Sequence, residues 1–414
     1  MKKLLLHRVA RPFQAEIQLP ASKSESNRAL ILNALAGGKA NLTNLSEARD
    51  TQTMLRLLKS DDTVADVLDA GTSMRFLTAF YAASGTRKTM TGTPRMQERP
   101  IGILVDALRE LGAGIGYQKN EGYPPLELSG FTSSGKKELT MRGDVSSQFI
   151  SAVLMIAPTL PEGLTLHLTG ALGSIPYIEM TIQQMRMFGA EVTADWEKKQ
   201  ITVAPKPYAA TDFAVESDWS GASYWYSFVA LGPEGSEVEL LGLKENSLQG
   251  DAAIVDIMRH LGVESTYTGR GFRLTKMAAQ EAFEWDFTHC PDLAQTISVI
   301  AAIKQVPAFF TGIESLKVKE TDRVLAIQQE LRKFGADLVE VVTNDRYQIR
   351  ISPDGPAPGT EIDTYDDHRM AMAFAPLAML ADTVIENPEV VVKSYPRFWE
   401  DLGKILVIEE LAHA

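Results

Sequence analysis

The chain repeats itself, and this duplication constrains its fold more than any other feature. Four segments share one pattern, in which an apolar residue and an arginine lie shortly before a glycine; the glycines are Gly112, Gly189, Gly262 and Gly335. They lie 77, 73 and 73 residues apart. Each glycine ends an amphipathic stretch and precedes a predicted strand, which is where a helix commonly ends on a left-handed residue. So even a spacing indicates internal duplication.

A second helix start recurs in the same register. Each start precedes an apolar run, and the starts are marked by residues spaced 74, 74, 73 and 73 positions apart: Arg75, Phe149, Ser223, Thr296 and Arg369. Short β-rich stretches lie between the helices, at 164–168, 200–203, 238–240, 347–351 and 390–392. Degenerate copies of the glycine pattern at 55–59 and 401–403 complete six units. We therefore expect an α/β fold of six units, each with two helices and several strands, arranged as two globes of three.

The first unit is short. From Arg28 to Arg75 is 47 residues, where the other units take 73 or 74. The shortfall lies at 59–68, so this unit should lack a helix or a hairpin. The fourth unit opens at 218–223. We therefore assign residues 19–217 to a first globe, and residues 1–18 together with 218–414 to a second globe.

Charge and motif content exclude several classes of protein. The 414 residues include 41 Lys and Arg against 53 Asp and Glu, a net charge of −12, which argues against a nucleic-acid or anionic-membrane partner. An acidic protein that binds anions must gather its cations locally. The sequence has no P-loop, no HExxH and no GxGxxG that opens a βαβ unit, which argues against kinases, metalloproteases and dehydrogenases.

We expect a cytoplasmic protein. The apolar run 4–6 ends at once in His7 and Arg8, which is too early for a signal peptide. The longest apolar stretch, 370–381, contains Pro376 and is too short to cross a bilayer. The single cysteine, Cys290, excludes an intrachain disulfide.

Residues 22–28 (Ser-Lys-Ser-Glu-Ser-Asn-Arg) precede an apolar run and predict a capped helix start, with Lys23 and Arg28 just ahead of the helix. Free N–H groups, the positive end of the helix dipole and the two cations together would bind an anion. The alternative is a capped helix whose charges are solvated. Taken alone, this segment gives both interpretations equal weight.

Two further helix starts carry clusters of charge. Lys319 and Arg323 flank Glu320 and share a face if the helix has begun there; an ion-paired first turn is the alternative. Residues 366–369 (Asp-Asp-His-Arg) offer metal ligands, but no second cluster supports a metal. A histidine and an arginine at a helix N-terminus suit an oxyanion or phosphate better.

Four weaker signals complete the set. Arg95 and Arg99 lie between prolines, either on a solvated loop or on a rigid one that aims arginine at a carboxylate. Residues 146–148 (Ser-Ser-Gln) most often only cap a helix. Asp292 is either an N-cap or a buried general base. Lys393 ends a strand-like run, where a solvated lysine is the default.

Considered together, these motifs place seven cations at or near helix starts and loop tips of the repeat: Lys23, Arg28, Arg99, Lys319, Arg323, Arg369 and Lys393. Such a set describes a cleft between two globes that is lined with positive charge. A cleft of this kind suits a substrate that carries several negative charges.

The motifs resemble, in order and over nearly the whole chain, those of the 5-enolpyruvylshikimate-3-phosphate synthases (3-phosphoshikimate 1-carboxyvinyltransferases). The resemblance is carried by residues 22–28, 70–75, 94–102, 145–149, 176–178, 319–323 and 367–372. It implies an enolpyruvyl transferase fold of two globes, each of three βαβαββ units, with helix N-termini facing the cleft. It also implies that the N-terminal strand returns to the second globe.

The implied reaction transfers the enolpyruvyl group of phosphoenolpyruvate to the 5-hydroxyl of shikimate 3-phosphate and releases phosphate through a tetrahedral intermediate. It needs no metal and no organic cofactor. Two anionic substrates require cations that offset their repulsion. Protonation of the methylene carbon and attack by the hydroxyl require an acid and a base. We expect a monomer without a nucleic-acid or membrane partner.

By this resemblance Glu320 is the proton donor, Asp292 is the base at the hydroxyl, and Lys23 lies between both substrates. The implied contacts of shikimate 3-phosphate are Ser24, Arg28, Ser146, Ser147, Ser174, Tyr177 and Lys319. Those of phosphoenolpyruvate are Gly71, Arg99, Arg323, Arg369 and Lys393, and Gln148 touches both ligands.

Three features depart from the family's pattern. Asp69 stands where Asn is usual and adds a negative charge near the phosphoenolpyruvate loop, and Ser315 replaces a usual Asn contact. The shortened first unit should remove part of the outer surface and leave the cleft intact.

Gly71 matches the glycine associated with glyphosate sensitivity. We therefore expect glyphosate to inhibit in competition with phosphoenolpyruvate.

Three alternatives remain. A UDP-N-acetylglucosamine enolpyruvyl transferase would share fold and donor, but it carries a reactive cysteine in the first globe, whereas Cys290 falls in the second. A non-catalytic phospho-ligand binder would fit better if Glu320 or Asp292 were missing. An RNA-end-processing enzyme on a related repeat conflicts with the net charge of −12.

Overall fold

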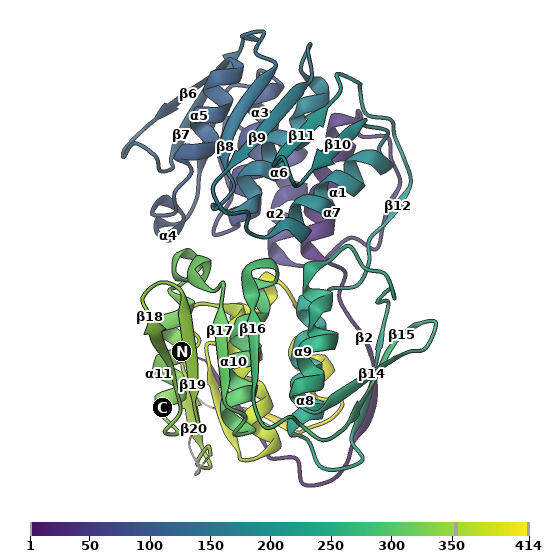
Figure 1. Cartoon of the computed structure of the whole chain (residues 1–414), viewed down its shortest axis with the longest axis vertical. Coiled ribbons are helices and arrows are strands. Elements are labelled where there is room, and N and C mark those ends of the chain that lie inside the picture. The colour runs from purple at the N-terminus through teal and green to yellow at the C-terminus, as the bar shows by residue number, and fades with distance from the viewer. Residues whose placement is uncertain (1, 352–354, 412–414) are drawn as a thin grey trace. The chain divides into compact units, whose positions relative to one another are not determined.

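The computed structural model describes residues 2–351 and 355–411 and divides into two compact units (Figure 1). The first unit is Ser22–Val215. The second unit combines Met1–Ala21 with Glu216–Ala414. Each unit has its own hydrophobic core, so each buries apolar surface independently of the other.

The first unit contains two complete repeats and a partial one. The partial repeat holds α1 (Lys23–Leu35), β3 (Leu42–Thr43) and α2 (Arg49–Leu58). The next runs through β4 (Val64–Asp66), α3 (Gly71–Ala83), β5 (Lys88–Thr91), α4 (Pro94–Gln97), α5 (Gly102–Leu111), β6 (Ala113–Tyr117) and β7 (Leu126–Phe131). The third runs through β8 (Glu138–Arg142), α6 (Ser147–Ile156), the 3₁₀ helix η1 (Ala157–Thr159), β9 (Leu164–Thr169), α7 (Ile175–Met187), β10 (Val192–Asp195) and β11 (Gln200–Val203), and β12 (Phe213–Ala214) follows.

The second unit contains three repeats. One comprises β2 (Gln14–Gln18), α8 (Trp219–Leu231), β13 (Glu237–Leu241), η2 (Gly250–Ala253), α9 (Ile254–His260), β14 (Val263–Tyr267) and β15 (Gly271–Lys276). The next comprises β16 (Phe283–Asp286), η3 (Phe287–His289), η4 (Pro291–Leu293), α10 (Ala294–Ile303), β17 (Ala308–Thr311), η5 (Glu314–Val318), α11 (Arg323–Arg332), β18 (Asp337–Val342) and β19 (Arg346–Arg350). The last comprises β20 (Thr360–Ile362), α12 (His368–Phe374), η6 (Ala375–Met379), β21 (Thr383–Glu386), η7 (Pro388–Lys393), α13 (Phe398–Leu402), β22 (Ile408–Leu411) and β1 (Lys3–Leu6).

Within residues 2–351 and 355–411, five four-stranded sheets share one topology, which confirms the predicted repeat. In each, the first strand of the βαβαββ unit runs parallel to the second, as β16 does to β17. The fourth strand runs antiparallel to both the second and the third, as β19 does to β17 and β18. The strand orders are β4-β5-β7-β6, β8-β9-β11-β10, β2-β13-β15-β14, β16-β17-β19-β18 and β20-β21-β1-β22.

The short repeat lacks its hairpin. Only the parallel pair β3 and β12 remains of its sheet, while α1 and α2 are both present. Helix α2 ends at Leu58 and β4 of the next repeat begins at Val64, so five residues stand where the other repeats build two strands. The sequence left open whether a helix or a hairpin was missing, and the structure decides for the hairpin.

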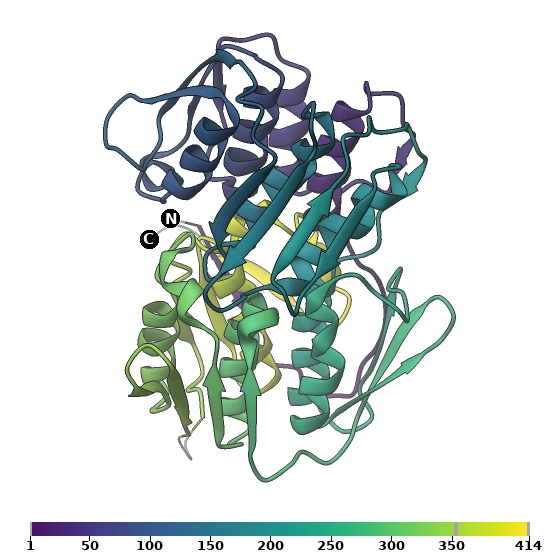
Figure 2. The ribbon, with the colours of Figure 1, turned by 45° about the horizontal axis from the view of Figure 1, so that its top comes forward.

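Two strands pair away from the helix that follows them in the chain. Strand β2 leads into α1 of the first unit but pairs with β13 of the second. Strand β12 leads into α8 of the second unit but pairs with β3 of the first. Strand β1 lies between β21 and β22, so Lys3 faces Leu411 and the first and last strands of the described chain lie side by side (Figure 1, Figure 2). The expected return of the N-terminal strand to the second unit is therefore confirmed.

The first helix of each repeat lies at the centre of its unit. Helices α8, α10 and α12 contact one another, as α1, α3 and α6 do. Nearly every residue of α8 and α10 is buried, and a helix that is apolar on all sides needs neighbours on all sides. Because equivalent helices pack together in each unit, the N-termini that carry the repeated polar residues are also brought together.

The four repeat glycines adopt the expected left-handed conformation. Their φ angles are 114° at Gly112, 86° at Gly189, 86° at Gly262 and 73° at Gly335. A side chain is strained at such angles, which explains the choice of glycine. Gly403, from a degenerate copy, has a φ of −59° and does not share this conformation.

Two predicted helix starts are displaced. Ser22 caps α1 by accepting from the Glu25 backbone N–H at 3.4 Å, so Lys23 and Arg28 lie inside the helix and not ahead of it. Conversely, α11 begins only at Arg323, after its cap Asp322. Lys319 therefore precedes the helix, with an extended backbone after η5, and the proposed shared helical face does not form.

The predicted strand at 390–392 is wrong. After β21, Asn387 takes a φ of 44° and Pro388 opens the 3₁₀ helix η7. Proline cannot donate to a sheet, and the left-handed residue turns the chain away from the strand direction. Val391 is buried by this turn and Lys393 at its end is buried too, so the default of a solvated lysine is also wrong.

In the described ranges we find no helix of the length and apolarity that a membrane span requires.

Candidate active site

Arg323 is the centre of a charged cluster in the second unit. Its Nε donates to Asp367 Oδ2 at 2.6 Å, its Nη1 to Asp292 Oδ1 at 3.1 Å and its Nη2 to Glu320 Oε2 at 2.8 Å. Only 2% of the Arg323 side chain is exposed. Pairing with carboxylates stabilises a buried arginine, since its charge cannot be removed at ordinary pH. Burial opposes the charge, but the carboxylates of Asp367, Glu320 and Asp292 outweigh it and raise the pKa of Arg323.

Asp292 collects three cations. Arg369 Nη2 donates to its Oδ2 at 2.8 Å, Arg323 to its Oδ1 at 3.1 Å, and Lys319 Nζ lies 3.8 Å from Oδ1. Burial raises the pKa of Asp292, but Arg369, Lys319 and Arg323 together outweigh burial and leave it well below its ordinary range. Asp292 lies in η4 and does not cap α10, so the N-cap interpretation is wrong.

Glu320 lies between two cations. Arg323 Nη2 holds Oε2 at 2.8 Å, and Lys393 Nζ lies 3.6 Å from Oε1. The Glu320 side chain is 13% exposed. The structure thus brings together all six site residues that the sequence predicted in this unit: Asp292, Lys319, Glu320, Arg323, Arg369 and Lys393.

Several partners in this cluster were missed or underrated. Asp367 caps α12 as expected, by accepting from the Arg369 backbone N–H at 2.8 Å, but it is also the fully buried partner of Arg323. Tyr224 Oη accepts from Arg369 Nη1 at 3.2 Å, and Ser220 Oγ lies 3.5 Å from Nη2. Ser220 lies within 218–223, where the sequence indicated the opening of the fourth unit. No comparable sequence signal pointed to Tyr224.

In the first unit, Arg99 is a buried cation with no partner among the described residues. Only 8% of Arg99 is exposed, and its Nε has no hydrogen-bond acceptor. Its guanidinium approaches Gly71 at the start of α3, where a Cβ would lie 2.8 Å from Nη2. No side chain caps α3. A free guanidinium beside an uncapped helix N-terminus is an arrangement that favours an anionic ligand.

Arg75 hydrogen-bonds to both segments that flank the Arg99 guanidinium. Its Nη1 donates to the Gly71 carbonyl at 3.1 Å and its Nη2 to the Pro100 carbonyl at 3.0 Å. The loop that carries Arg99 is thereby tied to the first turn of α3. Residues Pro94–Gln97 form the short helix α4, so the segment is more regular than the loop we expected, and Arg95 on it pairs with Glu98 at the surface.

Arg28 is a second buried cation, held by neutral groups. Its Nε donates to Thr181 Oγ1 at 2.6 Å, and its other nitrogens donate to the carbonyls of Ser24 at 3.0 Å and Tyr177 at 3.2 Å. No carboxylate of the described residues pairs with it. Burial lowers the pKa of Arg28 to about 10. A desolvated cation without a counter-ion favours an anionic ligand.

The remaining predicted residues of this unit lie at three other helix starts. Lys23 Nζ pairs with Asp50 Oδ2 at 3.0 Å, a partner from α2 that the sequence did not suggest. Gln148, at the start of α6, donates to Thr72 Oγ1 at 3.1 Å and so links α6 to α3. The first turn of α6 holds Ser147 and follows its cap Ser146. Ser174 occupies the N-cap position of α7 with a φ of 53° and makes no side-chain capping hydrogen bond.

The departures from the family pattern have simple structural settings. Arg49 Nη2 donates to both carboxylate oxygens of Asp69, at 2.9 and 3.0 Å, so the added charge beside α3 is neutralised. Ser315 is exposed in η5. Burial raises the pKa of the Cys290 thiol to about 12, which makes it a poor nucleophile. In the described ranges no three His, Cys, Asp or Glu side chains are grouped as metal ligands.

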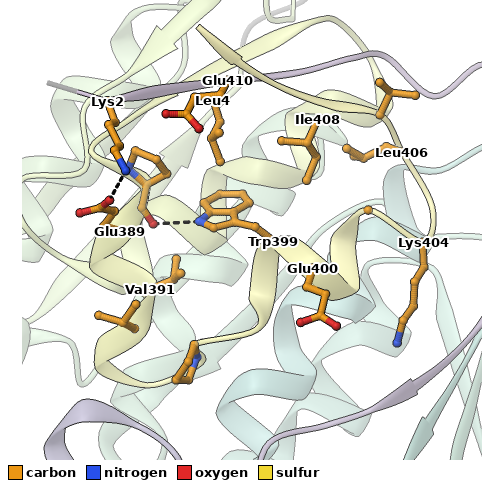
Figure 3. A pocket seen from close by; sticks show the side chains of 15 residues that line it. Lys2, Leu4, Glu389, Val391, Trp399, Glu400, Lys404, Leu406, Ile408 and Glu410 are labelled. Atoms are coloured by element: carbon orange, nitrogen blue, oxygen red, sulfur yellow. Dashed lines mark hydrogen bonds and ion pairs between the residues drawn. The ribbon is translucent and has the colours of Figure 1, made fainter. Parts of the chain in front are cut away.

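A concavity of about 910 Å³ in the second unit is distinct in character from the charged cluster (Figure 3). Trp399 lies within it and donates to the Pro388 carbonyl at 2.8 Å. Its charged side chains include Lys2 and Glu389, which pair with each other at 2.8 Å. The apolar walls come from β1, η7, α13 and β22, and none of the seven predicted cations lines it. We therefore do not place the chemistry there.

Comparison with known proteins identifies the family. The model of the family described as EPSP synthase (3-phosphoshikimate 1-carboxyvinyltransferase) matches residues 8–60 and 58–402. The chain belongs to the EPSP synthase family. A Bacteroides fragilis protein named 3-phosphoshikimate 1-carboxyvinyltransferase is 50% identical over 398 residues, covering 94% of this chain and 95% of that protein. A Salmonella heidelberg protein of the same name is 38% identical over 434 residues, covering 98% and 99%.

Solved structures agree on the fold. An EPSP synthase from Acinetobacter baumannii superposes with a TM-score of 0.79 at 22% identity, and the match covers 100% of both chains. A second structure of the enzyme from that organism gives a TM-score of 0.77 at 21% identity. The enolpyruvyl transferase fold expected from the EPSP synthase motifs is thereby confirmed.

Proposed function

We propose that this protein is a 3-phosphoshikimate 1-carboxyvinyltransferase, which transfers the enolpyruvyl group of phosphoenolpyruvate to the 5-hydroxyl of shikimate 3-phosphate and releases phosphate. Family membership and the curated names of relatives at 38–50% identity support this activity. The observation that carries it is the cluster around Arg323, in which an acid, a base and four cations lie within direct contact of one another.

We assign the anionic groups of the substrates to the cations of both units. Arg99 and the first turn of α3 offer a site for a phosphate or carboxylate, because that guanidinium has no partner among the described residues. Arg28 offers a second anion site, together with Ser146, Ser147, Ser174 and Tyr177 by motif match. Lys23, Gln148, Lys319, Arg323, Arg369 and Lys393 complete the proposed contacts.

The reaction needs one carboxyl to donate a proton and another to accept one. Glu320 donates a proton to the methylene carbon of phosphoenolpyruvate, and the 5-hydroxyl oxygen attacks the neighbouring carbon as its proton passes to Asp292. In the second step the bond to the phosphate oxygen breaks, and the phosphate leaves with the proton that Asp292 took from the hydroxyl. A proton passes from the methyl group back to Glu320, which restores the double bond and returns both carboxyl groups to their starting states.

Substrate binding supplies the protonation states that these roles need. Without ligand, Arg369, Lys319 and Arg323 overcome the effect of burial and hold the pKa of Asp292 well below its ordinary range, which makes it a weak base. A substrate carboxylate that binds Arg369 removes one of these attractions and raises the pKa of Asp292. Anionic groups on Arg323 and Lys393 likewise compensate the cations beside Glu320 and favour its protonated form.

Phosphate release tests the assignment. We expect release from phosphoenolpyruvate with shikimate 3-phosphate as acceptor, and none with UDP-N-acetylglucosamine. Release with the sugar nucleotide alone would assign the protein to the other enolpyruvyl transferases, and binding of both substrates without release would make it a binding protein. Glyphosate should inhibit competitively with phosphoenolpyruvate, and full activity at high glyphosate would contradict this part. We further propose that the protein is a cytoplasmic monomer. Size-exclusion chromatography with light scattering tests the monomeric state.

A further inference from the structure

Asp251 is a buried carboxylate that no motif of the sequence singled out. It lies in η2, in the segment that precedes α9, and only 2% of it is exposed. Its Oδ2 accepts a hydrogen bond from the hydroxyl of Ser220, in the first turn of α8. The neighbouring Gln249 accepts from the Trp219 backbone N–H at 3.0 Å and donates to the Ser217 carbonyl at 2.8 Å. The segment is therefore fastened to the N-terminus of α8 at several points.

Ser220 connects this carboxylate to Arg369. Its Oγ lies 3.5 Å from Arg369 Nη2, the same nitrogen that donates to Asp292 Oδ2 at 2.8 Å. When the Ser220 hydroxyl donates its hydrogen bond to Asp251, the lone pairs of its oxygen remain available to Arg369. The three groups thus form one chain from guanidinium to hydroxyl to carboxylate. Such chains strengthen each bond by polarising the next.

The charges that face Asp251 come from three elements. Burial and the charge of Asp292 in η4 raise the pKa of Asp251 to about 6, while Arg369 on α12 and the Ser220 hydrogen bond lower it and Asp218, the cap of α8, raises it. Cys290, before η4, is close enough for Asp251 to raise its thiol pKa, after burial. Asp251, whose pKa is raised, and Asp292, whose pKa is lowered, therefore both interact with Arg369.

We propose that Asp251 is a positioning residue for phosphoenolpyruvate binding, which orients Arg369 through the hydroxyl of Ser220. A substrate carboxylate on Arg369 competes with Asp292 for the same nitrogens. The bond to Ser220 then holds the guanidinium in place while Asp292 is released to act as a base. The inference rests on the proposed function, since it takes phosphoenolpyruvate as the ligand of Arg369.

Steady-state kinetics of Asp251→Asn, Ser220→Ala and the double variant test this role. Each single variant should raise KM for phosphoenolpyruvate about tenfold, as loss of one hydrogen bond to a charged group predicts, while KM for shikimate 3-phosphate stays within about twofold. If Asp251 acts through Ser220, KM for phosphoenolpyruvate in the double variant should not exceed the larger of the two single-variant values. Asp256→Asn, exposed on α9, is the matched control and should behave as the wild type.

The pH profile separates positioning from a structural role. In the wild type, KM for phosphoenolpyruvate should fall as the pH rises through about 6. Ionised Asp251 accepts the hydrogen bond of the Ser220 hydroxyl and so orients Arg369. Asp251→Asn should lose this inflection. The ionisation of phosphoenolpyruvate itself is common to both proteins, so the difference between the two profiles belongs to Asp251.

A carbon-13 titration of the Asp251 carboxyl needs no turnover. The signal is assigned by its loss in Asp251→Asn, and Ser220→Ala should raise its pKa because a donor to the charged form is removed. Unchanged KM for phosphoenolpyruvate in Asp251→Asn, additive effects in the double variant, or an equal loss for both substrates would each overturn the proposal. A wild type that releases no phosphate would instead refute the proposed function, and an unmoved carboxyl titration in Ser220→Ala would then overturn the positioning role separately.

Discussion

A methyl group added at Gly71 should weaken phosphoenolpyruvate binding without weakening the fold. The Cβ of Gly71→Ala would lie 2.8 Å from Arg99 Nη2 and 2.9 Å from Nη1, where ordinary contacts begin at 3.4 Å. The guanidinium must therefore retreat by about 0.6 Å, the difference between those distances. It can do so, because it is the far end of a flexible side chain.

The retreat moves the donor atoms of the proposed anion site. A hydrogen bond to a charged group contributes roughly 1.5–3 kcal/mol, so lengthening one or two of them should cost roughly 1–2 kcal/mol. That corresponds to an increase of about 5- to 30-fold in KM for phosphoenolpyruvate. Alanine is a better helix former than glycine, so the melting temperature should not fall.

Steady-state kinetics with each substrate varied in turn will check this magnitude. We expect KM for shikimate 3-phosphate to change by less than about twofold, since the perturbation is local to Arg99. Gly116→Ala is the control, because no heavy atom lies within 4 Å of a Cβ added there. An unchanged KM for phosphoenolpyruvate in Gly71→Ala, or an equal rise for both substrates, would refute the assignment of Arg99.

Four further outcomes are expected. Glu320→Gln should bind both substrates but release phosphate at least about a hundredfold more slowly; unchanged turnover would remove it as the acid. Arg49→Ala removes the guanidinium that donates to both carboxylate oxygens of Asp69 beside α3, so it should raise KM for phosphoenolpyruvate a few-fold, and added Asp69→Asn should restore it. Asp367→Asn should lower the free energy of unfolding by about 3–5 kcal/mol in denaturant titrations, because it breaks a fully buried ion pair. The pKa of Asp251 is about 6 in the fold and 3.8 in the unfolded chain, so the wild type loses stability as the pH rises from about 4 to 6. Over this range the free energy of unfolding of Asp251→Asn should rise relative to that of the wild type by on the order of 3 kcal/mol. A constant difference between their urea midpoints would contradict this.

The repeated helix ends were predictable because their causes are local. A left-handed residue after the last turn favours glycine whatever packs around it, so Gly112, Gly189, Gly262 and Gly335 could be recognised in the sequence. The run 390–392 was misread for the opposite reason. Its valines have strand propensity, but the turn at Asn387 and the burial of Val391 decide its conformation.

The candidate site divides in the same way. The cations at helix starts could be found because repetition marked those starts. Their partners could not, because each pairing joins residues that are distant in the chain: Lys23 with Asp50, Arg323 with Asp367, and Arg369 with Asp292. Nothing in a sequence states which carboxylate will neutralise which cation when several helix ends meet.

By itself, then, the sequence determined that six related units exist, that one is truncated, and that positive charge gathers at their helix starts. It also identified the EPSP synthase family through its ordered motifs. Only the tertiary structure decided that the missing element is a hairpin and that β2 and β12 pair away from the helices that follow them in the chain. It alone left Arg99 with no partner among the described residues while pairing Arg323 three times. Periodicity and backbone preference act over a few residues, whereas charge compensation depends on which helices pack together.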